Sequence, residues 1–416
     1  MRRTARATEP RPGTTPDPVP ASMPGRVVLL LIGARGVFRL TVQAGPLVLL
    51  PVWGAGTFAQ YANAVGVCTW LIYVSAGAEK AALKLLPRSR RLTGDVVRWV
   101  LAVAAVPVLP VLVALAVAGP GRPRLYLAAG LWSLANGLLI LLAALHRLAG
   151  RPVRDAVIFG TMAAATVTMI GLTWLLGLSP VQLLLALAGV ALGLTGLFVV
   201  ALPRPWLRER SGRQSRWIVL RSLWLLGLAD MLGSLCGTVA YAALGLSGQT
   251  ADSDALYIAM LFCVGFGALL TLLLRLAQPR TSVRLRGTGA VGGRRTAVRL
   301  LRAGALGGVV SAVALGVGVA AGLSPVALLG LVAACEIPVY AAVTYGANLV
   351  ENTDGQALSL TSGSSAAGLA VSVLAAAVLV PPLGAAGALA AVLLSYAAKS
   401  AALWRFLVIH YDAGRR

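Results

Sequence analysis

Acidic residues are scarce in this sequence of 416 residues, which has 13 Asp and Glu against 36 Lys and Arg. Charged residues of both signs make up only 12% of the chain, whereas soluble domains have about 25%. Hydrophobic residues make up 58% and the mean hydropathy is +0.84. This composition excludes an ordinary soluble domain and indicates an all-α membrane protein with many spans.

Cysteine and histidine are also rare, with four and two residues. The cysteines all fall in apolar segments, so a disulfide framework is not expected. No metal-ligand spacing occurs, and the phosphate-binding pattern of ATPases, Gly-x-x-x-x-Gly-Lys-Ser/Thr, is absent. We therefore predict no metal site and no cofactor.

Long apolar segments are abundant, and twelve of them are long enough to cross a bilayer. Gly and Pro mark the joints between them, as at 119–121, 177–180 and 381–382. The predicted spans are 27–52, 56–78, 97–119, 125–146, 156–176, 180–202, 217–244, 254–275, 303–322, 325–347, 359–380 and 384–406.

The distribution of basic residues predicts the topology. With the amino terminus in the cytoplasm, 31 Lys and Arg fall on the cytoplasmic side, two fall outside and three lie within spans. This asymmetry obeys the positive-inside rule and accounts for most of the net charge of +23. Both termini are predicted to be cytoplasmic, in a bacterial plasma (inner) membrane. No aromatic–basic platform accompanies the basic loops, so nucleic acid is not an expected partner.

The spans divide into two halves. We expect a disordered, basic and Pro-rich cytoplasmic tail and two six-helix lobes joined by a cytoplasmic linker. The predicted divisions are 1–24 for the tail, 25–202 for the first lobe, 203–216 for the linker, 217–408 for the second lobe and 409–416 for a second cytoplasmic tail.

A polar stripe on the first span is the strongest functional feature. Arg35, Arg39 and Gln43 follow one another at steps of four, which places them on one face of a helix. An Arg near the bilayer centre costs on the order of 3 kcal/mol. The two arginines therefore need a polar cavity or polar partners.

A shift of 195 positions reveals a second stripe. It matches Arg35 with Asp230, Arg39 with Ser234 and Gln43 with Thr238. Two halves in the same orientation predict a parallel repeat about a pseudo-two-fold axis normal to the membrane.

Further polar residues occur within other spans. A third stripe begins at Glu336 and Tyr340, Lys399 lies in the last span, and Gln60 and Asn63 lie in the second. Structural interpretations stay open for several. In the first, Arg35 or Arg39 forms a structural ion pair with Asp230 or Glu336. In the second, Glu336 is neutral and hydrogen-bonded. In the third, the Lys399 side chain extends to the membrane–water interface.

Two local stretches give the chain a family resemblance. They are residues 56–62 (GTFAQYA) and 379–390 (LVPPLGAAGALA), within an arrangement of twelve spans. The sequence resembles the multidrug/oligosaccharidyl-lipid/polysaccharide exporter (MOP) superfamily, and within it the Wzx-type polysaccharide (O-antigen) flippases.

This resemblance implies two lobes around a central cavity that opens to either side in turn. It implies a flippase of polysaccharide biosynthesis that moves an anionic, undecaprenyl-diphosphate-linked saccharide and is not an enzyme. Two guanidinium groups suit a diphosphate, which offers several acceptor oxygens. The predicted substrate-binding residues are Arg35, Arg39, Gln43, Gln60, Asn63, Ser234 and Thr238.

For Asp230, Glu336, Tyr340 and Lys399 we expect charge pairing or coupling to protons or sodium. Membrane lipids and polysaccharide-assembly proteins are the other expected partners. Three alternatives stay open. The first is a multidrug or cation antiporter of the same superfamily, which Asp230 and Glu336 favour. The second is a membrane-embedded glycosyltransferase or polymerase, although no nucleophile–base arrangement is present. The third is a non-transporting scaffold for the assembly of a surface polymer, which buried and fully paired polar stripes would favour.

Overall fold

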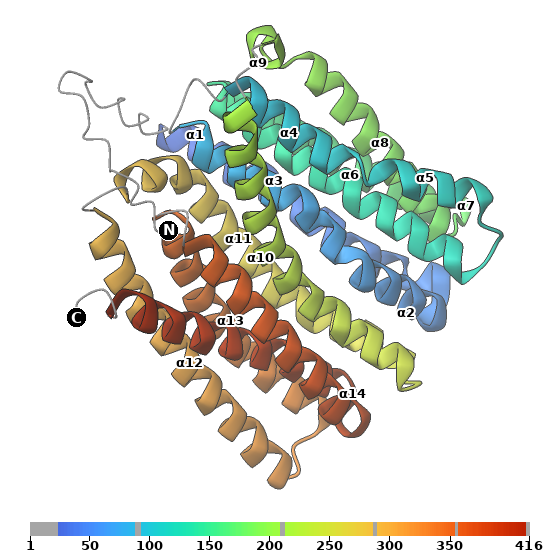
Figure 1. The fold of residues 1–416 in the computed structure, drawn as a ribbon. Coiled ribbons are helices and arrows are strands. Elements are labelled where there is room, and N and C mark those ends of the chain that lie inside the picture. Colours follow the sequence, from blue (N-terminus) through green and yellow to red (C-terminus); the bar gives the residue numbers. More distant parts are fainter. Residues whose placement is uncertain (1–23, 88–92, 209–212, 286–288, 354–356, 413–416) are drawn as a thin grey trace.

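The structure is a computed structural model that describes residues 24–87, 93–208, 213–285, 289–353 and 357–412. Within these ranges the regular elements are helices, and the long ones run side by side along one direction (Figure 1). Ten helical stretches are long and apolar enough to cross a membrane. Two of them, Gly25–Leu85 and Leu358–His410, have 61 and 53 residues. Each is long enough to cross a hydrocarbon core of about 30 Å twice.

A break divides each of these two stretches. In the first, the chain passes through a short 3-10 helix, Gly45–Leu49, and then reaches Gly54, where φ is 73°. In the second, Pro381 and Pro382 precede Gly384, where φ is 54°. Glycine adopts positive φ without the steric cost that other residues incur. With these two breaks the described residues contain twelve segments of membrane-spanning length, the number that the sequence predicts.

Six crossings form the amino-terminal lobe. They are α1 (Gly25–Gln43), α2 with α3 (Leu50–Cys68 and Ile72–Leu85), α4 with α5 (Thr93–Ala105 and Val108–Val117), α6 (Arg122–Leu148), α7 (Pro152–Leu176) and α8 (Pro180–Val200). Helix α6 lies in the middle of this lobe, and 94% of its most apolar window is buried. Its buried Leu and Ala side chains belong to the largest hydrophobic core cluster of the described chain.

The other six crossings form the carboxy-terminal lobe, drawn from yellow-green to red in Figure 1. They are α10 (Arg213–Leu246), α11 (Ser253–Arg284), α12 (Gly289–Ala320), α13 (Pro325–Glu351) and the two halves of α14 (Ala357–Asp412). The short helix α9 (Arg204–Arg208) lies in the proposed linker 203–216.

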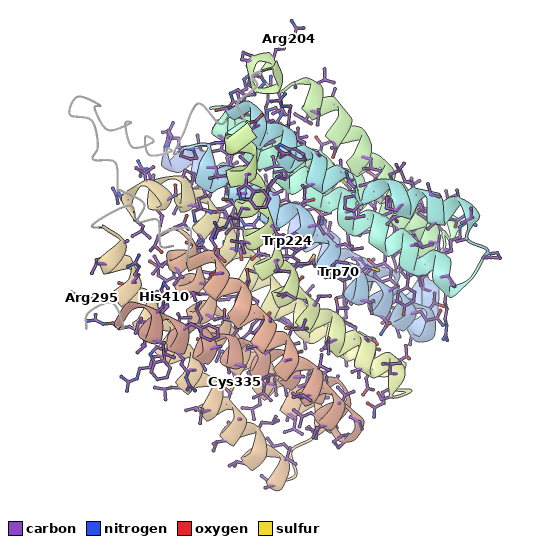
Figure 2. The ribbon with its side chains drawn as sticks, in the orientation of Figure 1. Trp70, Arg204, Trp224, Arg295, Cys335 and His410 are labelled. Atoms are coloured by element: carbon purple, nitrogen blue, oxygen red, sulfur yellow. The ribbon has the colours of Figure 1, made fainter. Side chains whose placement is uncertain are left out.

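The helix ends form two opposite faces of the bundle. We call one the basic face: α1 begins there, α14 ends there, and Arg204 and Arg295 lie at this end of their helices (Figure 2). We call the other the plain face, and it has the turns at Gly177, Gly322 and Gly384. The sequence predicts that the basic face is cytoplasmic.

Three helices extend into segments that the sequence predicts as basic loops. Helix α3 continues to Leu85, α11 continues to Arg284 and α12 already begins at Gly289, so these helices extend beyond the predicted spans 56–78, 254–275 and 303–322. The predicted spans end where charge begins, but backbone hydrogen bonds of a helix form regardless of side-chain polarity. The charged residues of these extensions therefore belong to ordered helices.

The predicted tails lie largely outside the described residues. This applies to residues 1–23 and to 413–416. Residues 409–412 are the last residues of α14, so the predicted tail 409–416 starts within a helix.

Candidate functional site

The basic-face end of α3 places a buried carboxylate between the lobes. Glu79 is 0% exposed. It forms an ion pair with Arg147 of α6 at 3.2 Å, within its own lobe, and another with Arg275 of α11 in the other lobe. One acidic side chain thus holds two arginines from different lobes.

The next residue along α3, Lys80, is a cation that pairs with two carboxylates of the other lobe. Lys80 Nζ lies 2.6 Å from Asp230 Oδ1 of α10 and 3.0 Å from Glu351 Oε2 of α13. One turn further, Lys84 donates to the Glu351 backbone carbonyl, while Gln278 of α11 donates to the Lys80 carbonyl. Consecutive residues of opposite charge therefore bind the carboxy-terminal lobe through complementary partners.

Arg35 is bound within the amino-terminal lobe. Its Nε and Nη2 donate to the two Asp155 oxygens of α7 at 3.0 and 2.8 Å, and its guanidinium lies 4.6 Å from the centre of the Phe159 ring. Asp155 is also paired with Arg147 at 3.0 Å. Helical side chains point toward the helix amino terminus, which for α1 is at the basic face, where α7 begins. The alternative that Arg35 pairs with Asp230 or Glu336 is wrong.

Arg39 differs from Arg35 although it lies on the same face of α1. It is partly exposed and forms no ion pair with a residue that the structure describes. The ionisable groups near enough to influence it electrostatically are Tyr73 of α3, Tyr340 of α13 and Arg35. Arg275 is influenced by both arginines and both tyrosines. Arg39 therefore faces the seam between the lobes, in a cationic and aromatic environment.

Lys399 enters the same region from α14. It is half-buried, its ammonium points toward α10 beside Gly233, and Asp230 and Glu351 influence it without ion-pair contact in the described chain. The Lys399 side chain therefore does not extend to the membrane–water interface.

We call these groups the interlobe charge cluster, in which cations outnumber carboxylates. Its members are Arg35, Arg39, Glu79, Lys80, Lys84, Arg147, Asp155, Asp230, Arg275, Glu351 and Lys399.

Glu336 lies apart from this cluster, inside the carboxy-terminal lobe. It is 3% exposed, and its Oε2 has no hydrogen-bond partner in the described chain. The Cys263 thiol of α11 is near enough to influence it electrostatically and donates to the Ala333 carbonyl. Nearby, Tyr340 packs against Tyr396 with ring centres 5.1 Å apart. A buried carboxyl group without a full set of partners is costly and suits a site that takes up a proton or a cation.

Three predicted binding residues take part in hydrogen bonds that involve a backbone carbonyl group. Ser234 Oγ donates to its own helix, at the Met231 carbonyl, and Thr238 Oγ1 donates across the seam to the Val67 carbonyl at 3.1 Å. The Gln43 carbonyl accepts from the Tyr257 hydroxyl of α11 at 2.7 Å. The last two contacts join the lobes toward the plain face.

Gln60 and Asn63 are brought together at the plain face. They line a cavity of about 370 Å³ between α2, α6 and α10, and we call it the plain-face pocket. Asn63 is buried and donates to the Tyr241 carbonyl of the other lobe at 3.0 Å.

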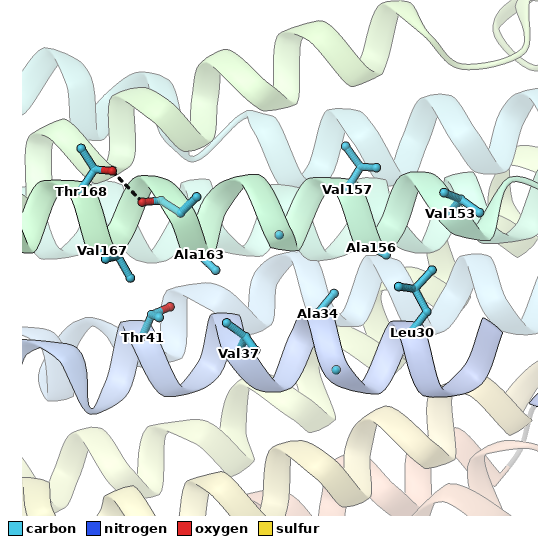
Figure 3. A pocket seen from close by; sticks show the side chains of 13 residues that line it. Leu30, Ala34, Val37, Thr41, Val153, Ala156, Val157, Ala163, Val167 and Thr168 are labelled. Atoms are coloured by element: carbon cyan, nitrogen blue, oxygen red, sulfur yellow. Dashed lines mark hydrogen bonds between the residues drawn. The ribbon is translucent and has the colours of Figure 1, made fainter. Parts of the chain in front are cut away.

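A larger hollow of about 890 Å³ lies between α1 and α7 (Figure 3). Apolar side chains dominate its lining. Its hydroxyl groups, of Thr41 and Thr168, donate to carbonyls of their own helices. With its polar groups satisfied in this way, the hollow fits contact with lipid chains better than recognition of a polar ligand.

A close backbone contact near Glu79 gives a test of the seam. A Cβ on Gly77 of α3 would collide with the Gly227 backbone of α10, whereas a Cβ on Gly227 would lie 3.9 Å from the Gly77 Cα. We expect G77A to destabilise the protein by about 1–3 kcal/mol through overpacking, while G227A has little effect. Thermal unfolding in detergent compares the two. Equal effects would contradict a seam packed as described.

The sequence did not identify most members of the cluster. Glu79, Lys80, Arg147, Arg275 and Glu351 lie at span ends, where charge is expected from topology alone. The one signal in the sequence that could have pointed to Glu79 and Glu351 is the rarity of acidic residues, since the whole chain has only 13 Asp and Glu.

Comparison with known proteins supports the fold. No protein-family model matches the chain, and no curated protein sequence matches it. Among solved structures, an outward-facing multidrug resistance MATE family transporter of the MOP superfamily is 12% identical, with a TM-score of 0.51 and coverage of 94% of this chain and 96% of that one. An inward-facing structure of a multidrug resistance MATE family transporter of the MOP superfamily is 14% identical, with a TM-score of 0.50 and coverage of 93% of this chain and 95% of that one.

The Vibrio cholerae MATE transporter VcmN in its bent form is 14% identical, with a TM-score of 0.52 and coverage of 94% and 98%. At these identities the similarity concerns the fold alone. The chain is a multi-pass membrane protein with the twelve-span, two-lobe fold of these transporters.

Proposed function

We propose that this protein is a transporter that moves an anionic, undecaprenyl-diphosphate-linked saccharide across the bacterial plasma membrane by alternating access. The observation that supports this most is the excess of cations in the interlobe charge cluster. Arg39 and Lys399 lack an ion-pair partner among the described residues. A cation held in a low-dielectric seam is costly unless an anion joins it. A diphosphate between the lobes would supply that anion.

The two faces of the seam are held differently, which fits alternating access. At the basic face the lobes are joined by buried ion pairs through Glu79 and Lys80. Toward the plain face they are joined by neutral hydrogen bonds through Asn63 and Thr238. An anion that enters the seam competes with Glu79 for Arg275 and thereby weakens the contacts that keep the basic face closed.

Coupling to protons or sodium would use Glu336 and Asp230. Glu336 has an unpartnered carboxyl oxygen, and Asp230 Oδ2 is also without a hydrogen-bond partner in the described chain. The saccharide stays linked to its carrier, so the protein acts as a flippase and no enzymatic step is proposed. Polysaccharide-assembly proteins are the proposed partners.

The second candidate is a multidrug or cation antiporter. The buried carboxylate of Glu336, next to the aromatic pair Tyr340 and Tyr396, favours it, as does the fold shared with MATE transporters. A cationic drug would need Glu336 and would be repelled by Arg39.

Reconstituted vesicles test the two candidates. We expect the protein to expose a fluorescent undecaprenyl-diphosphate-linked saccharide to a quencher on the other side, and to leave ethidium gradients unchanged. Empty vesicles give the background rate. Ethidium movement that is lost in E336Q, without any movement of the labelled lipid, would overturn the proposal in favour of the antiporter.

A further inference from the structure

The plain-face pocket combines side chains from both lobes. Gln60 and Asn63 of α2 and Arg122 and Tyr126 of α6 line one side, and α10 with Thr250 lines the other. Its volume of about 370 Å³ is within the range of ligand sites in proteins, roughly 300–1,000 Å³.

One wall of this pocket is fixed by hydrogen bonds. The Tyr126 hydroxyl donates to Asn63 Oδ1 at 2.6 Å, and Asn63 Nδ2 donates to the Tyr241 carbonyl at 3.0 Å and lies 3.3 Å from Ser253 Oγ. Asn63 is therefore fully engaged and buried. Its role is to hold the Tyr126 ring in place and to join the lobes behind the pocket.

Three other polar side chains of the lining, those of Gln60, Arg122 and Thr250, are available to a ligand. Gln60 and Arg122 are exposed, and neither bonds to a residue within the described ranges. None of the residues lining the pocket is acidic. The nearest carboxylate along the chain, Asp252, is directed at the turn around Gly384. An anion bound at Arg122 would therefore meet no negative charge in the lining.

The rest of the lining is apolar and comes from Val67, Leu125, Ala242, Gly245 and Leu246. A few convergent polar groups in an otherwise apolar hollow are typical of sites for small organic ligands. An amide, a hydroxyl and a guanidinium suit a molecule with both hydroxyl groups and an anionic group.

We propose that the plain-face pocket binds the phosphorylated sugar of a saccharide head group, with Arg122 on the phosphate and Gln60 on sugar hydroxyls. This rests on the proposed function for the substrate class, and it adds a second subsite at the plain-face end of the seam. Because both lobes contribute to the pocket, a bound head group stabilises the arrangement in which the plain face is closed.

Calorimetric titration of the purified protein with glucose 1-phosphate tests the site, with glucose and inorganic phosphate as comparison ligands. We expect R122Q to weaken binding of glucose 1-phosphate at least about tenfold and Q60A about fivefold, as for charged and neutral hydrogen bonds. R124Q is the matched control, because Arg124 is exposed on the same turn but does not line the pocket. It should bind as the wild type does.

A second measurement does not depend on heat of binding. Glucose 1-phosphate should slow maleimide labelling of a cysteine introduced in the pocket by A242C, and R122Q should remove this protection. Equal affinities of R122Q and R124Q would overturn the proposal, and so would inorganic phosphate binding as tightly as glucose 1-phosphate.

The fate of the proposed function is separable from this result. R39A should retain glucose 1-phosphate binding, since Arg39 does not line the pocket. If the vesicles fail to move the labelled lipid while binding still depends on Arg122, the transport proposal fails and the pocket stands.

Discussion

Replacing Arg39 by alanine should lower the affinity for undecaprenyl diphosphate by about 10- to 100-fold and leave the fold intact. The expected loss, about 1.5–3 kcal/mol, is that of a hydrogen bond to a charged group. R39K should recover part of the affinity, because an ammonium keeps the charge and loses the forked geometry. Binding of undecaprenyl diphosphate to protein in detergent measures the effect.

Arg35 supplies the matched control for this experiment. Its guanidinium forms a buried ion pair with Asp155. Removal of one partner of a buried ion pair lowers the folding stability by about 3–5 kcal/mol. R35A should therefore lower the melting temperature strongly, whereas R39A should not. If R39A melts like R35A, or binds undecaprenyl diphosphate like the wild type, Arg39 is a structural residue and the substrate must bind elsewhere.

Neutralising Glu79 should open the basic face. E79Q leaves Arg275 without the carboxylate that joins it to the other lobe, and leaves Arg147 with Asp155 alone. We expect a loss of about 3–5 kcal/mol from the closed arrangement, which is enough to shift a two-state equilibrium by more than a hundredfold.

Spin labels at R204C and R295C can report this opening. Both positions are exposed, and they lie at the basic face on opposite sides of the seam (Figure 2). E79Q should lengthen the distance between the labels. D95N is the control, because Asp95 pairs with Arg98 inside α4. An unchanged distance in E79Q would mean that the charge cluster stabilises the lobes without controlling the seam.

The polar residues on the first span show which features of the site the sequence can predict and which it cannot. Arg35 and Arg39 share a helix face and look equivalent in the sequence. Arg35 is neutralised by Asp155, whereas Arg39 has no ion pair with a described residue and lies within electrostatic range of Tyr73 and Tyr340. Their difference depends on which helix packs against each, and periodicity along α1 contains no such information.

The sequence by itself determined that this chain crosses the membrane twelve times in two lobes, because hydrophobic length and the placement of Lys and Arg are local properties. Only the tertiary structure decided which charges meet. Arg35 and Asp155 are 120 positions apart, and Lys80 and Glu351 are 271 apart. A charge at a span end looks the same in sequence whether it faces water or a carboxylate of the other lobe, and packing of the lobes makes that choice.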